Sequence, residues 1–165
     1  MGKTVIIKGA NFSENAIELQ YVYNYSDSFF EVAERTWANR TGYAIVDEQD
    51  ALALRHKILK GVRMNISQAG SMAIYKCSNL DGGLDALTYL CTIQTDVPGI
   101  QNLLFGTVIT LNDGEYLVFG TPGENFNLLP KFRSSGVTNQ PFAYDVGLGG
   151  ATTQQAGNLC IDFLY

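Results

Sequence analysis

The chain has 165 residues, of which 46% are hydrophobic, 12% aromatic and only 16% charged. A chain of this length can form one domain that removes roughly 70% of its unfolded surface from water, and its apolar composition excludes intrinsic disorder. The net charge of -5 would repel a phosphate backbone, so we expect no nucleic acid partner.

Basic side chains form no strong patch. The nearest approach to a cluster comprises Arg55, His56, Lys57, Lys60 and Arg63. Because these residues alternate with apolar ones, we interpret them as the solvent-facing side of an element rather than as a nucleic-acid groove.

The three cysteines, Cys77, Cys91 and Cys160, are an odd number without the spacing of a disulfide scaffold. Cys77 and Cys91 could face each other if residues 70–77 pair with residues 88–95, but the alternation does not set the register. We interpret all three as buried, reduced thiols.

The N-terminal third predicts short strands over residues 4–8, 15–23 and 41–46. Residues 24–40 show no clear period and predict a long loop with a helical turn or two. In residues 51–58 the helix and strand patterns are nearly balanced, and the β-rich context favours an extended conformation.

Clearer alternation follows, and we expect strands over residues 62–67, 71–77, 87–95 and 103–111. The turn at Gln68-Ala69-Gly70 predicts one β-hairpin. The stretch VITLNDGEYLVFG, residues 108–120, predicts a second hairpin around Asn112-Asp113-Gly114. The apolar face of its first strand is Leu103, Phe105, Thr107, Ile109 and Leu111.

Residues 126–132 and 141–146 are further strand candidates, and residues 159–165 predict a last strand paired inside a sheet. In that strand Asp162 alternates with Ile161 and Phe163, which predicts a carboxylate pointing away from the core.

Short strands with frequent turn signals and no regular alternation with helices favour two packed antiparallel sheets. We therefore expect one all-β domain over residues 1–165. Its predicted form is an antiparallel β-sandwich of jelly-roll type with eight to ten strands and at most one or two short helices.

The residues that catalysis or metal binding usually needs are sparse. His56 is the single histidine, which disfavours a catalytic triad or a zinc site. No phosphate-binding glycine motif occurs, and we expect no cofactor. A hydrolase with two carboxylates is compatible with 16 acidic residues, and Asp81 and Asp85 give a weak hint of calcium.

Aromatic residues give the main functional lead, because sugar rings stack on exposed aromatic side chains while polar groups bind the hydroxyls. Trp37 is the single tryptophan and has Asn39, Arg40 and Tyr43 close by in sequence. We predict these four residues as a ligand-binding set, with packing at one end of the sandwich as the alternative. Tyr21, Tyr23 and Tyr25 would share a face if residues 19–25 are extended.

Three phrases carry a family resemblance: VIIKGANFSENAI (5–17), GVRMNISQAGSMAIYKC (61–77) and VITLNDGEYLVFG (108–120). They resemble β-sandwich modules of surface and phage-tail-associated proteins of gut Bacteroidetes, some attached to an acylhydrolase domain of the GDSL type. The resemblance implies an adhesion or accessory module that contacts a glycan or host surface, and trimeric assembly if the source is a tail fibre. The Gly-Asp-Ser nucleophile motif of the acylhydrolases is absent from this sequence.

These observations predict a non-catalytic module that recognises carbohydrate or a cell-surface polymer. The alternative is a structural module of a fibre or larger surface protein, self-associating as a homo-oligomer through exposed aromatic residues. We expect a soluble chain without membrane insertion, and an extracellular or virion-associated location stays open.

Overall fold

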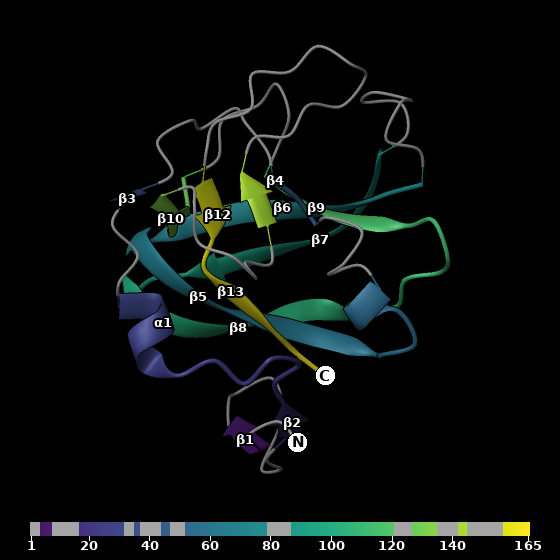
Figure 1. The fold of residues 1–165 in the computed structure, drawn as a ribbon, viewed down its shortest axis with the longest axis horizontal. Helices are drawn as coiled ribbons and strands as arrows, with labels where there is room; N and C mark the ends of the chain where they lie inside the picture. The colour runs from purple at the N-terminus through teal and green to yellow at the C-terminus, as the bar shows by residue number, and fades with distance from the viewer. Residues whose placement is uncertain are drawn as a thin grey trace.

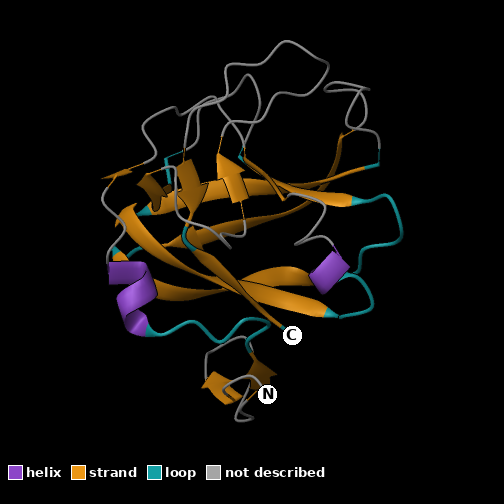
Figure 2. Cartoon of the chain, viewed as in Figure 1, coloured by secondary structure: helices purple, strands orange, loops and turns teal. Residues whose placement is uncertain are grey.

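The structure is a computed structural model that describes residues 4–7, 17–31, 35–36, 44–46, 52–78, 87–120, 127–134, 142–144 and 157–165. Two antiparallel sheets lie face to face in these ranges (Figure 1; Figure 2). The predicted all-β sandwich is thereby confirmed.

The first sheet, here called the β5 sheet, is built around its long central strand. Its members are β3 (Arg35–Thr36), β5 (Leu59–Gln68), β8 (Gly99–Ile109), β10 (Leu129–Ser134), β12 (Gly157–Leu159) and β13 (Ile161–Leu164). Strand β5 pairs with β8 along one edge and with β13 and β10 along the other.

The second sheet, here called the β6 sheet, has the order β11-β4-β9-β6-β7. Its members are β4 (Ala44–Val46), β6 (Gly70–Cys77), β7 (Leu87–Thr95), β9 (Tyr116–Phe119) and β11 (Phe142–Tyr144). Strand β6 pairs with β7, which meets the condition under which Cys77 and Cys91 could face each other. The register places Cys91 opposite Ile74 rather than opposite Cys77.

A separate two-stranded ribbon of β1 (Thr4–Ile7) and β2 (Ile17–Gln20) lies beside the β5 sheet (Figure 1). The chain end is fastened to this ribbon, because Gln20 and Tyr165 exchange two backbone hydrogen bonds of 2.9 Å. The helix α1 (Asp27–Glu31) follows, which confirms a helical turn within residues 24–40. No helix in the described ranges has both the length and the apolar content to cross a membrane.

The core fills the space between the two sheets. Alternation in β5 turns Val62, Met64 and Ile66 inward, where they are almost fully buried. Phe119 of the β6 sheet meets Phe163 of the β5 sheet edge to face, with ring centroids 6.4 Å apart. The aromatic pair therefore joins the sheets directly.

Both predicted β-hairpins are wrong, although each turn lies where it was expected. Strand β5 leads into β6 through Ala69, and β8 leads into β9 through residues 110–115, yet neither pair of strands is hydrogen-bonded together. Each connection instead crosses from the β5 sheet to the β6 sheet. An alternating apolar face suits either arrangement, because facing strands also turn their apolar sides toward each other.

The crossing from β5 to β6 is fixed by Asn127. The amide N–H of Ser71 donates to Asn127 Oδ1 at 2.7 Å, and Gln68 Nε2 donates to the Asn127 carbonyl at 2.9 Å. A Cβ at Gly70 would lie 2.4 Å from Asn127 Oδ1, so only glycine fits this close approach. Glycine thus marks a corner between sheets rather than a hairpin turn.

The extended conformation favoured for residues 51–58 is also wrong. Residues 52–54 form a helical turn, and His56 has a φ of 68°, which a continuous strand does not allow. This turn buries Arg55, whose guanidinium lies 5.6 Å from the centre of the Tyr116 ring, so its predicted exposure is wrong as well. His56 is exposed, as expected.

Four of the five residues predicted to face inward are buried: Leu103, Phe105 and Ile109 in β8, and Leu111 just after it. Thr107 is exposed instead. The cause is a shift in the β5–β8 register between the pairs Gly61–Leu104 and Leu59–Ile109, which lets the intervening β8 residues leave the alternating pattern.

Candidate functional site

The four residues predicted to bind a ligand, Trp37, Asn39, Arg40 and Tyr43, lie outside the described residues. The neighbouring described strands are β3, which pairs with β10 in the β5 sheet, and β4, which pairs with β9 in the β6 sheet. Asp81 and Asp85, the calcium hint, also lie outside the described residues. Both assignments stay predictions.

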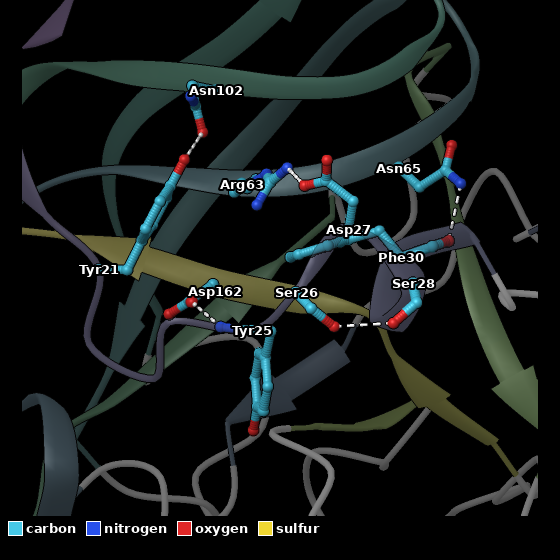
Figure 3. Close-up of polar contacts among 10 residues, drawn as sticks. All are labelled: Tyr21, Tyr25, Ser26, Asp27, Ser28, Phe30, Arg63, Asn65, Asn102 and Asp162. Atoms are coloured by element: carbon cyan, nitrogen blue, oxygen red, sulfur yellow. Dashed lines mark hydrogen bonds and ion pairs between the residues drawn. The ribbon is translucent and has the colours of Figure 1, made fainter. Parts of the chain in front are cut away.

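A row of polar residues crosses the outer face of the β5 sheet. The register places Asp162 of β13, Arg63 of β5 and Asn102 of β8 opposite one another. Residues 20–31, here called the strap, run over this row (Figure 3). Tyr21 from the strap donates its hydroxyl to Asn102 Oδ1 at 3.1 Å.

Asp162 anchors the strap. It points away from the core between Ile161 and Phe163, as predicted, but the strap covers it, so that it is only 1% exposed. Its Oδ1 accepts the backbone N–H of Tyr23 at 2.9 Å and of Phe163 at 2.8 Å, while Oδ2 accepts that of Tyr25 at 3.1 Å. Burial raises the pKa of Asp162, and these N–H donors oppose the rise. The Asp162 carboxylate therefore binds backbone N–H groups of the strap and holds it on the sheet.

Arg63 fastens the helix end of the strap. Its guanidinium carbon lies 5.5 Å from the centre of the Tyr21 ring and 4.7 Å from that of Phe30, and it forms an ion pair with Asp27 (Figure 3). Asn65 Nδ2 adds a 2.8 Å hydrogen bond to the Phe30 carbonyl. Arg63 and Asn65 therefore hold α1 on the sheet.

The strap aromatics are stacked on one another. The Tyr25 ring is 3.9 Å from that of Phe29 and 5.2 Å from that of Tyr23, measured between centroids. Tyr21 lies apart from this stack, over Arg63, so the three tyrosines do not share the face that an extended conformation of residues 19–25 would have given them. The extended conformation that this face required ends near Tyr21.

The outer face of the β6 sheet carries a more accessible aromatic pair. Tyr75 of β6 and Tyr89 of β7 lie directly opposite each other, with ring centroids 5.9 Å apart and planes at 75°. Tyr89 is 57% exposed, and its hydroxyl shares a 2.8 Å hydrogen bond with Thr92. We call Tyr75, Tyr89 and Thr92 the tyrosine face.

A β-bulge creates this pair. The register runs from Ile74–Cys91 to Tyr75–Tyr89, so Leu90 is the extra residue. Leu90 packs against the core while Tyr89 turns outward beside Tyr75. Bulges commonly redirect side chains in this way next to functional sites.

Polar side chains continue from the tyrosine face along the same pair of strands. Thr92 lies opposite Ala73, whose small side chain leaves room beside the rings, and Gln94 lies opposite Ser71. Thr92 and Gln94 are exposed. The surface therefore combines aromatic rings with hydroxyl and amide groups that can exchange hydrogen bonds with a ligand.

Sequence reasoning missed Tyr75 and Tyr89. The available signal was the sequence Tyr89-Leu90-Cys91, in which strict alternation cannot place both Cys91 inward and Tyr89 outward. Without a known register, that break could not be assigned to a bulge.

Among the described residues, the cysteines lie in the interior rather than on this face. All three cysteines are free and buried, as expected, and burial raises the pKa of the Cys91 thiol. Within the described ranges, no group of three or more His, Cys, Asp or Glu side chains is placed to hold a metal ion.

Comparisons with known proteins return no matching family model, curated protein or solved structure for this chain.

Proposed function

We propose that the protein is a non-catalytic binding module that recognises carbohydrate through the tyrosine face. The exposure of Tyr89 beside Tyr75, produced by the bulge in β7, is the observation that supports this proposal. The predicted set of Trp37, Asn39, Arg40 and Tyr43 is kept as a second candidate contact region.

The chemistry of the tyrosine face suits a sugar. Apolar C–H faces of sugar rings stack on aromatic side chains, and the edge-to-face geometry of Tyr75 and Tyr89 leaves ring surface that neither partner covers. Thr92 and Gln94 offer donors and acceptors for hydroxyl groups. The hydrogen bond between the Tyr89 and Thr92 hydroxyls holds the ring in place before binding, which lowers the entropic cost of binding.

A glycan array probed with the purified protein tests the proposal. We expect binding that weakens about tenfold or more, about 1.4 kcal/mol, in Tyr89→Ala. The matched control is Val97→Ala, which shortens another exposed apolar side chain, and it should bind as the wild type does.

A Trp37→Ala variant on the same array separates the two candidate regions. Loss of binding in this variant alone would move the site to residues 37–43 and overturn the role of the tyrosine face. An array without binding would contradict carbohydrate recognition altogether.

A second candidate function is self-association within a fibre or larger surface protein. Leu52 and Ile58 favour it, because they are 61% and 55% exposed on the same short segment. This function predicts a solution mass that is a multiple of 18.1 kDa, and it predicts that Ile58→Asp returns the mass to that of one chain. A single-chain mass at high protein concentration would contradict it.

A further inference from the structure

A groove of about 460 Å³ opens between β2 and the irregular part of β8. Residues Leu104 to Val108, together with Leu19 and Lys60, form its walls. We call it the β8 groove.

The register of β5 and β8 explains why the groove exists. Gly61 pairs with Leu104 and Leu59 pairs with Ile109, so four β8 residues lie opposite Lys60 alone. These residues bow away from β5 and leave a hollow. A Cβ added at Gly106 would meet no atom within 4 Å, which places open space directly at the bowed segment.

The walls of the groove are mostly apolar. Leu19 and Phe105 are largely buried against the rest of the fold, and Val108 is 63% exposed. Exposed apolar surface in a concavity is unfavourable in water and is typical of ligand sites.

Among the described residues that line the groove, Lys60 is the one that carries a charge. The net charge of the chain is -5, so Lys60 places a positive charge beside the β8 groove in a molecule that is negative overall. An apolar groove with the Lys60 ammonium group beside it complements a ligand that has an alkyl chain and an anionic head.

We infer that the β8 groove binds a single-chain anionic amphiphile, an alkyl carboxylate, with its chain along Leu104 to Val108 and its carboxylate beside Lys60. The inference does not depend on carbohydrate binding, because β8 belongs to the opposite sheet from Tyr75 and Tyr89.

Isothermal titration with sodium decanoate, kept below its aggregation concentration, tests the inference. We expect saturable binding of one decanoate per chain, weakened about tenfold or more in Lys60→Glu. The matched control is Lys131→Glu on β10, which makes the same charge change away from the groove and should leave binding unchanged. Gly106→Leu, which places a side chain into the open space, should also weaken binding.

Three results would overturn the inference: no saturable heat with decanoate, equal binding by Lys60→Glu, or equal binding of decyltrimethylammonium by the wild-type chain. Binding to phosphatidylglycerol vesicles without binding to monomeric decanoate would also overturn it, because it would indicate a membrane surface rather than a groove ligand. Tyr89→Ala should retain decanoate binding, which separates this result from failure of the proposed carbohydrate site.

Discussion

Gly61 of β5 lies in close contact with two neighbouring strands. A Cβ there would lie 2.5 Å from the Leu103 carbonyl oxygen and 3.2 Å from Leu164 Cδ1. Because the first of these atoms is backbone of a paired strand, Gly61→Ala has to displace β8. We expect the free energy of unfolding to fall by about 1–3 kcal/mol, measured by urea denaturation.

Gly106→Ala is the matched control for this prediction. Its Cβ would meet nothing within 4 Å, so the free energy of unfolding should change by no more than about 0.5 kcal/mol. Equal losses in the two variants would show that intrinsic strand preference, rather than crowding at Gly61, sets the effect.

Asp162 should give the stability of the protein an unusual pH dependence. Its pKa is raised by burial above the ordinary value of 3.8, so the folded chain holds this proton more tightly than the unfolded chain. The contribution of this group to stability is therefore fully present below about pH 3.8 and is lost as the pH rises through the raised pKa.

Urea denaturation of the wild type and of Asp162→Asn from about pH 3 to pH 7 tests the direction of this pH dependence. The free energy of unfolding of the wild type, minus that of the variant, should decrease as the pH rises. An increase would mean that the N–H donors of Tyr23, Tyr25 and Phe163 outweigh burial.

At the scale of elements, local residues predict the positions of turns better than the pairing of strands. Asn112-Asp113-Gly114 does form a turn, with Gly114 at φ 78° and a 3.1 Å hydrogen bond from Glu115 N–H to the Asn112 carbonyl. Whether the strands on either side pair or face each other depends on distant partners, β5 for β8 and both β4 and β6 for β9. Those partners cannot be identified from a turn.

Glu115 holds this crossing in place. Its carboxylate accepts the Asn112 N–H at 2.8 Å and forms a 3.2 Å ion pair with Lys76 of β6. Burial raises the pKa of Glu115, but these partners outweigh burial and lower it overall. The stabilisation is therefore present above the pKa of the unfolded chain and is lost as the pH falls through the folded pKa.

We expect Glu115→Gln to lower the free energy of unfolding by about 0.5–1.5 kcal/mol at neutral pH, with a smaller difference in acid. Denaturation at both pH values measures it, and Glu31→Gln on the exposed side of α1 is the matched control. A loss that does not shrink in acid would contradict a role for the ionised carboxylate.

At the scale of the whole molecule, the sequence predicts the two-sheet sandwich but not the arrangement of the side chains on its surface. Alternation such as that of Val62, Met64 and Ile66 requires only that one side be buried, which any two-sheet packing satisfies. The tyrosine face depends on a single unpaired residue, Leu90, and the strap depends on a buried Asp162. Both features arise from tertiary pairing, so periodicity could not reveal them.

The three buried thiols make it possible to measure whether the whole molecule unfolds cooperatively. Cys91 belongs to the main core, Cys160 packs with Phe30 of α1, and Cys77 packs with Val118 of β9. Because the three lie in separate clusters, N-ethylmaleimide labelling followed by mass mapping reports on three regions at once. The raised pKa of Cys91 further slows its reaction.

If the strap, the core and the β9 region unfold as one unit, all three thiols should label slowly in buffer and share one dependence on urea. Early labelling of Cys160 alone would contradict this, since it would mean that α1 leaves the sheet independently. Asp27→Asn, which removes the ion pair with Arg63, should then accelerate Cys160 selectively, whereas in a cooperative molecule it accelerates all three thiols equally.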